Sequence, residues 1–190
     1  MERTVIDPLD QKAASGGIAN LLDHCVGLKP GQKLLVVTEP AEESFYRDEL
    51  GALTAQEARR RGAEVKLVTH PPVAGPEDFP RVVLDEIAVS DHTIFFSRLG
   101  IQARFRDLPG PGQKVVAYTL DGPALAASFG SLSYGFLQDL HQAVVGELAK
   151  ARSYRIQCDL GTDLRMELNP DDLAAEPLLT PFAVRNFSPS

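Results

Sequence analysis

Short apolar runs alternate with amphipathic segments along most of the chain. Four runs have the length of strands: KLLVVTE (33–39), AEVKLVTH (63–70), HTIFFSR (92–98) and QKVVAYT (113–119). The first is continuously apolar, which suits a strand buried on both faces. Four other segments carry apolar residues at helical spacing: 17–26, 47–62, 76–90 and 134–151. This alternation predicts an α/β fold with a doubly wound, mainly parallel sheet of about four strands and flanking helices.

A different pattern follows the last predicted helix, in YRIQCDLGTDLRMEL (154–168). Apolar and polar residues alternate on both sides of a short segment that contains Gly161. Alternation with a period of two around a turn predicts a C-terminal antiparallel hairpin with one wet face. An isolated hairpin is marginally stable in water, so we expect it to join further structure.

The same patterns suggest three parts. Residues 1–14 are polar and predict a flexible N-terminal arm. The alternating strands and helices predict an α/β domain over 15–152, and the hairpin with the irregular segment after it forms a C-terminal extension, 153–190. We interpret this extension as the remnant of a second domain.

The balance of charges narrows the choice of partners. The formal net charge is −7 and the sequence pI is about 5.1. Without a cationic excess the chain lacks the electrostatic term that drives binding to nucleic acid or to an anionic membrane. No apolar run reaches the length of a membrane span, and MERTVIDPLDQKAASGG has no apolar core of a secretory signal.

Two cysteines occur, Cys25 on the apolar side of a predicted helix and Cys158 on the apolar side of the hairpin. We expect both to be buried free thiols that pack as small hydrophobes, with a disulfide as the alternative. Free thiols are typical of a reducing compartment, so the expected location is the cytoplasm.

The loop after the first predicted strand does not fit a phosphate. It reads TEPAEESFY (38–46) and contains neither GxGxxG nor GxxxxGK[ST]. Glu39, Glu42 and Glu43 stand where a phosphate would need backbone N–H groups, and we interpret them as a solvated helix N-terminus.

Other catalytic patterns are missing as well. The serines of SFGSLSYG (128–135) do not form a G-x-S-x-G elbow. No two histidines have metal-ligand spacing; they are His24, His70, His92 and His141. We therefore expect no catalytic residue, no metal site and no cofactor.

Two blocks resemble the aminopeptidase T (M29) metallopeptidases. VGLKPGQKLLVVTEP (26–40), followed by GAEV (62–65), looks like the opening of that family, and GTDLRMEL (161–168) resembles its GTDL segment. In the family this segment leads from the N-terminal α/β domain to the catalytic domain, an architecture that related 2,5-dihydroxypyridine dioxygenases share. The resemblance covers most of residues 15–168. It implies that the family's metal ligands lie in a portion this sequence lacks, since no residue here matches them.

The resemblance implies a non-catalytic relative that keeps the α/β half and binds a peptide. A precursor peptide in peptide natural-product biosynthesis is the partner this suggests. The alternative is an enzyme, with this chain as the N-terminal part of a cut or two-chain metallo-aminopeptidase or related dioxygenase. A third hypothesis is that the protein is a purely structural subunit.

Three residues are the candidate peptide contacts. Arg98 closes the third predicted strand at the edge where such sheets bind ligands, and Arg104 follows in the same connection. Both could hold a peptide carboxylate by charge-assisted hydrogen bonds. Tyr134 begins the long helix and offers an apolar ring with a polar tip. We expect the hairpin to complete the site, because a free strand edge can accept a peptide.

We also expect a homodimer. Without a second domain the inner face of the hairpin would be bare, which comprises Ile156, Leu164, Met166 and Leu168. Large exposed apolar patches are rare on soluble monomers, and homodimers are the commonest way to cover them.

Overall fold

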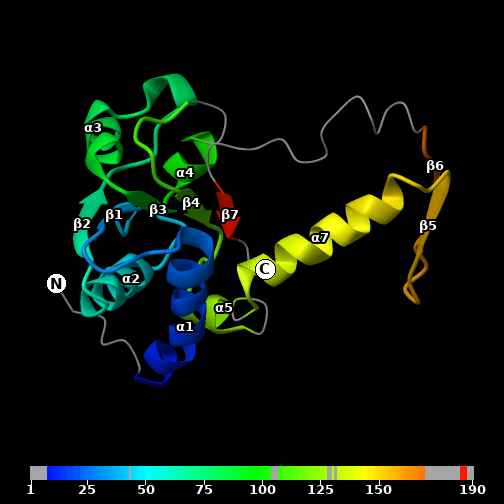
Figure 1. Ribbon diagram of the computed structural model, residues 1–190, viewed down its shortest axis with the longest axis horizontal. Coiled ribbons are helices and arrows are strands. Elements are labelled where there is room, and N and C mark those ends of the chain that lie inside the picture. Colours follow the sequence, from blue (N-terminus) through cyan, green and yellow to red (C-terminus); the bar gives the residue numbers. More distant parts are fainter. Residues whose placement is uncertain are drawn as a thin grey trace. The chain divides into compact units, whose positions relative to one another are not determined.

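The computed structural model describes residues 8–42, 44–103, 107–127, 130, 132–169 and 185–187. Its main sheet is parallel throughout, with strand order β2-β1-β3-β4-β7 (Figure 1). The strands are β1 Lys33–Thr38, β2 Glu64–Thr69, β3 His92–Phe96, β4 Lys114–Ala117 and β7 Arg185–Phe187. A separate antiparallel hairpin consists of β5 (Ser153–Gln157) and β6 (Asp163–Glu167). The predicted fold class, a mainly parallel sheet with flanking helices plus a C-terminal hairpin, is confirmed.

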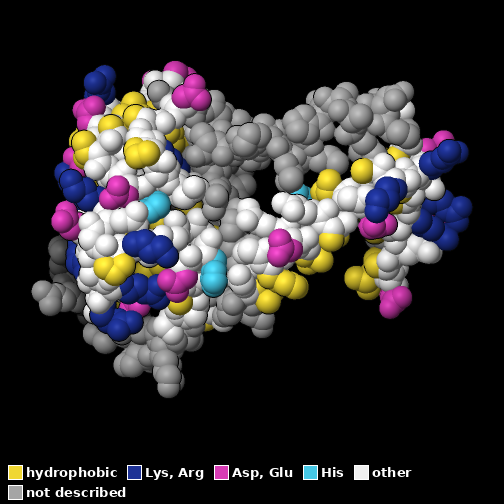
Figure 2. Space-filling view, in the orientation of Figure 1, with side chains coloured by type: hydrophobic (Ala, Val, Ile, Leu, Met, Phe, Trp, Pro, Cys, Tyr) yellow, Lys and Arg dark blue, Asp and Glu magenta, His cyan; other side chains and the backbone are white. Residues whose placement is uncertain are grey.

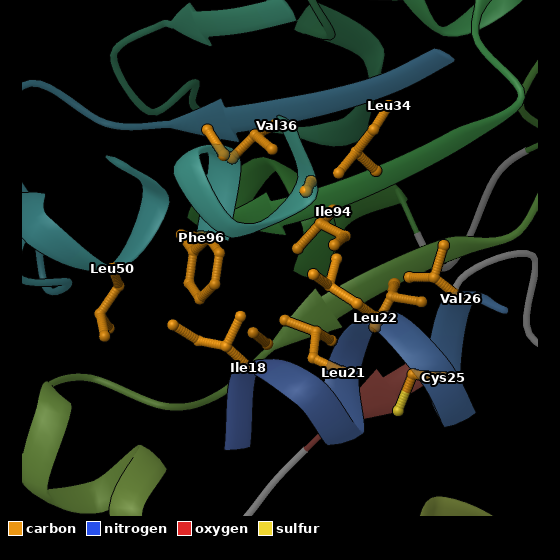
Figure 3. Close-up of a cluster of buried hydrophobic side chains, with 14 of the residues drawn as sticks. Ile18, Leu21, Leu22, Cys25, Val26, Leu34, Val36, Leu50, Ile94 and Phe96 are labelled. Atoms are coloured by element: carbon orange, nitrogen blue, oxygen red, sulfur yellow. The ribbon is translucent and has the colours of Figure 1, made fainter. Parts of the chain in front are cut away.

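Helices cover both faces of the main sheet. They are α1 Pro8–Asn20, α2 Asp48–Arg60, α3 Arg81–Val89, α4 Arg98–Ala103 and α5 Gly122–Ala126, with the π-helix η1 Leu21–Val26 and the 3₁₀ turn η2 Pro76–Asp78. One face packs against α1, η1, α2 and α5, in the core cluster of Figure 3. The other face packs against α3 and α4. The central strands read as continuous apolar runs because side chains on both of their faces are buried.

Alternate residues of β1, β3 and β4 enter different cores. Val36 and Phe96 lie in the first cluster, whereas Val37 and Phe95 lie in the second. Helix α4 approaches β3 closely because Gly100 has no side chain: a Cβ there would lie 2.5 Å from Phe95 Cβ. Burying a side chain such as Phe95 contributes about 1.5–3 kcal/mol.

The first helix differs from the prediction. It was predicted for 17–26, but α1 begins at Pro8, so residues 8–14 of the predicted arm are helical. Proline suits the first turn of a helix, and the alanines that follow are strong helix formers without apolar periodicity. The helix then continues as η1, and it ends at Gly27, which has a positive φ of 71°. Residues 1–7 lie outside the described residues.

The helix predicted for 76–90 is divided in two. Phe79 and Pro80 are extended, with ψ angles of 127° and 129°, between η2 and α3. The residue before a proline is disfavoured in the α-helical region, which ends the first segment. Strand β7 was not predicted, since its residues were assigned to the irregular extension.

The chain forms two compact units. Unit 1 comprises Met1–Tyr134 and Phe182–Ser190, and unit 2 comprises Gly135–Pro181. Helix α7 (Tyr134–Leu148) therefore belongs almost entirely to the same compact unit as the hairpin. Residues 185–187 return to the main sheet beside β4.

Candidate functional site

The hairpin of unit 2 separates apolar from charged side chains on its two faces. Tyr154 faces Met166 and Ile156 faces Leu164, so these four share one face. The Tyr154 hydroxyl donates to the sulfur of Met166 over 3.1 Å. The other face carries Ser153, Arg155, Gln157, Asp163, Arg165 and Glu167.

The apolar face is open to solvent. Ile156 is 52% exposed, Leu164 44% and Met166 46%. Figure 2 shows hydrophobic side chains at the surface of both the hairpin and helix α7. Exposed apolar surface that is contiguous marks an interaction site more often than scattered apolar residues do.

Within the described ranges, no further strand pairs with the outer backbone edge of β5 or of β6. The N–H of Leu168 donates to the carbonyl of Arg152 over 2.8 Å, and that of Cys158 donates to Thr162 over 3.1 Å. In an antiparallel ladder such bonds recur at every second residue, so even-numbered residues bond within the hairpin. The N–H and C=O groups of odd-numbered residues therefore point outward. On β5 these belong to Ser153, Arg155 and Gln157, and on β6 to Asp163, Arg165 and Glu167.

The turn of the hairpin is tight and exposes a thiol. Gly161 adopts a positive φ of 101°, which suits glycine, and its N–H donates to the carbonyl of Cys158. The predicted burial of Cys158 is wrong, since this free cysteine is exposed, whereas Cys25 is a buried free cysteine as predicted. Hydrogen bonds from the Thr162 side chain and from backbone groups of the turn lower the pKa of the Cys158 thiol.

Charges on the polar face of the hairpin are unevenly paired. Arg155 forms a bidentate pair with Asp163, with both nitrogen–oxygen distances at 2.6 Å. Arg165 lies directly opposite Arg155 in the ladder. Among the described residues, neither Arg165 nor Glu167 forms an ion pair. Like charges directly opposite each other destabilise a sheet. A carboxylate bound to Arg165 from outside the hairpin would offset this repulsion.

Helix α7 has an apolar stripe at four-residue spacing. Phe136, Leu140 and Val144 are 54%, 51% and 50% exposed. Residues four apart lie on one helix face, so the three form a continuous row. Helix α7 therefore adds a second exposed apolar surface to unit 2.

An ion pair between a buried carboxylate and a partly exposed guanidinium group lies at the carboxyl edge of the main sheet in unit 1. Glu39 follows β1, and its side chain is fully buried, so the interpretation of this acid as solvated is wrong. Its Oε1 accepts from the backbone N–H of Arg98 at the start of α4, over 2.5 Å. Arg98 Nε lies 3.0 Å from Oε1 and 3.1 Å from Oε2. The carboxylate thus caps α4 and holds the guanidinium group of its first residue.

Aromatic rings complete this arrangement. The guanidinium carbon of Arg98 lies 4.5 Å from the centroid of the Phe45 ring, within cation–π range. Tyr46 packs edge-on against Phe96, and burial raises the pKa of its hydroxyl. A hollow of about 250 Å³ lies beside Glu39, between Thr38 and Leu67. Its polar groups already have partners, because Thr38 bonds Thr69 over 3.0 Å and Glu39 bonds Arg98.

The three predicted peptide contacts have different positions. Arg98 lies at the predicted sheet edge, but it is engaged by Glu39 of its own chain. Arg104 lies outside the described residues. Tyr134 is the first residue of α7, and its side chain also lies outside the description. The hairpin edge is part of the site that the sequence predicts, but no residue of β5 was named there, although the alternation around Arg155 was the signal for them.

No metal-ligand cluster of three or more His, Cys, Asp or Glu residues occurs in the part of the chain that the structure describes. His92 has a structural role: its Nδ1 accepts from the Gln113 N–H over 3.2 Å, and its Nε2 lies 3.2 Å from Gln32 Oε1. Burial lowers the pKa of this imidazole. Within the described ranges, every helix is too short or too polar to cross a bilayer.

Comparison with known proteins gives a likeness of structure at low sequence identity. No family model matches the chain, and no curated protein matches it either. Among solved structures, 2,5-dihydroxypyridine dioxygenase from Pseudomonas putida KT2440 is similar over 84% of this chain, with 13% identity and a TM-score of 0.48. The chain spans about half the length of that dioxygenase, 48%. At this level the likeness carries no functional argument, and the resemblance to aminopeptidase T stays a prediction.

Proposed function

We propose that this protein is a non-catalytic peptide-binding protein and that an extended peptide adds to the free edge of β5. The observation that supports this is the row of outward N–H and C=O groups on Ser153, Arg155 and Gln157. An extended peptide satisfies such groups by continuing the ladder, so its main chain supplies affinity.

Side chains on β5 would select the peptide. Tyr154 and Ile156 lie on the apolar face, so peptide residues beside them gain by being apolar. Arg155 lies on the opposite face and favours an acidic or polar neighbour. The preferred peptide alternates β-branched or aromatic residues with polar ones. A precursor peptide of that pattern fits the site.

Edge β5 is a better acceptor for varied peptides than β6. Its polar face carries two neutral residues, Ser153 and Gln157, around Arg155. The polar face of β6 alternates in charge along Asp163, Arg165 and Glu167, which restricts its partners to one charge pattern.

A proline at the free edge tests the proposal. Gln157→Pro removes an outward N–H and places a ring where a peptide would approach, while the hairpin keeps its own hydrogen bonds. Gln157→Ala keeps the N–H and is the matched control. Both would be titrated by calorimetry with peptides, selected from an array, that alternate valine with glutamate or serine.

We expect Gln157→Pro to weaken binding at least about tenfold, since one lost backbone bond and the steric block together exceed about 1.4 kcal/mol. Gln157→Ala should bind as the parent does. Equal affinity of Gln157→Pro and the parent, or no binding by any peptide of the array, would reject this site.

A further inference from the structure

The free edge of β6 is complementary to itself in one register. Its polar face reads Asp163, Arg165, Glu167, while Leu164 and Met166 lie on the apolar face. Asp163 is already held by Arg155. Within the described part of the chain neither Arg165 nor Glu167 has an ion-pair partner, and this cation and anion stand two residues apart on the outer edge of β6.

Antiparallel pairing of two β6 edges about a two-fold axis allows few registers. With the axis at Arg165, this residue faces its own copy, and two like charges oppose each other. With the axis at Leu164, Arg165 faces Asp163 of the second copy, which Arg155 already occupies. With the axis at Met166, Arg165 faces Glu167 of the second copy, and Glu167 faces Arg165. Of these three registers, only the one with the axis at Met166 pairs both Arg165 and Glu167 with an opposite charge.

The backbone agrees with this register. Arg165 and Glu167 are odd-numbered residues, whose N–H and C=O groups point outward from the hairpin. They therefore form the hydrogen-bonded pairs of the new ladder. Met166 faces its own copy in a non-hydrogen-bonded pair, where side chains come closest. Leu164 faces Leu168 of the second copy, so apolar residues meet on the other face.

We propose that the β6 edge is a homodimer interface, in which a second copy of this chain pairs antiparallel with the two-fold axis at Met166. The two hairpins then form one four-stranded sheet, which is more stable in water than either hairpin alone. The interface is isologous, as is usual for dimers. It leaves the β5 edges free, so the proposal neither needs nor excludes a bound peptide.

Charge reversal tests the register. Arg165→Glu places glutamate against Glu167 of the second copy, and Glu167→Arg places arginine against Arg165. The double variant Arg165→Glu/Glu167→Arg restores opposite charges. Arg165→Glu also puts an acid opposite Arg155, and this opposite-charge pair stabilises the hairpin itself. A loss of dimer in this variant therefore cannot be attributed to an unfolded hairpin.

The mass of the full chain would be measured by sedimentation equilibrium as the concentration varies. The parent is expected to approach twice its 20.6 kDa. Each single variant should raise the dimer dissociation constant about tenfold or more, and the double variant should return close to the parent. A parent that stays monomeric at high micromolar concentration, or a double variant no better than the singles, overturns the proposal.

Cross-linking supplies a second, independent readout. In a Cys158→Ser background, Met166→Cys places two thiols across the axis, where opposed Cα atoms lie about 4.5 Å apart, within disulfide range. Leu164→Cys is the matched control, because it faces Leu168. We expect a disulfide-linked dimer from Met166→Cys and none from Leu164→Cys. The reverse result, or no cross-link in either variant, contradicts the register.

Discussion

Buried Glu39 and partly exposed Arg98 form an ion pair across the carboxyl ends of two neighbouring strands, although 59 residues separate them in the chain. Arg98 Nε lies 3.0 Å and 3.1 Å from the two carboxylate oxygens, and Phe45 lies over its guanidinium group. The pair joins the end of β1 to the start of α4. A residue predicted to bind a peptide carboxylate therefore binds a carboxylate of its own chain.

Removing Arg98 should destabilise the sheet domain. Arg98→Ala leaves Glu39 buried with fewer donors, which costs about 2–3 kcal/mol in the free energy of unfolding. Urea unfolding followed by circular dichroism measures the change. Arg81→Ala is the control, because Arg81 is 87% exposed in its pair with Asp85 and should change stability by less than about 1 kcal/mol. Equal stability of the two variants would show that the Glu39–Arg98 pair does not stabilise the fold.

The free energy of unfolding at acidic pH should depend on the ionisation of Glu57. A hydrogen bond from Arg60 is the main cause that lowers the pKa of Glu57 to about 2, and Arg61 also contributes. The unfolded value is about 4.3, so the ionised form stabilises the fold above that pH, and the gain is lost as the pH falls toward 2. Glu57→Gln should lower stability by about 0.5–1 kcal/mol at pH 7, with the difference shrinking below about pH 4.

Urea unfolding at several pH values checks this, with Glu64→Gln as the control, since Glu64 forms no ion pair with a described residue. If the loss of stability in Glu57→Gln persisted unchanged at pH 2, the ionised carboxylate would not be its cause.

The two cysteines should differ in reactivity. Cys158 is exposed with a lowered pKa, so alkylation by iodoacetamide should reach its half-maximal rate below the usual thiol pKa of about 8.5. Thr162→Val removes the side-chain hydrogen bond and should move that midpoint to higher pH. Buried Cys25 is the internal control and should react only after unfolding. Mass spectrometry of the two peptides separates the sites, and an unchanged midpoint in Thr162→Val would remove the assigned cause.

Sequence patterns predicted the strands well because burial on both faces leaves continuous apolar runs, as in Leu34–Val37. They failed where stability comes from contacts rather than periodicity. The first turns of α1 have no apolar stripe, and β7 has only three residues, so neither has a periodic signal. Both were recognisable only from the tertiary structure.

The candidate site was predicted in part. The alternation around Gly161 predicted the hairpin and its two faces, whereas the exposure of the apolar face was seen only in the structure. Alternation does not show whether a face is covered, and for this reason the predicted burial of Cys158 was wrong. The partner of Arg98 could have been found, since an acid and an arginine at the carboxyl ends of adjacent parallel strands lie close together.

Residue-resolved amide hydrogen exchange on β5 tests the central claim most directly. The protein would be measured by NMR with and without a saturating peptide chosen from the alternating valine array. Peptide addition to the β5 edge predicts exchange at least about tenfold slower at Ser153, Arg155 and Gln157, whose N–H groups point outward. Tyr154 and Ile156 already bond within the hairpin and should change less. Unchanged exchange at the three odd-numbered residues while the peptide is bound would contradict the account.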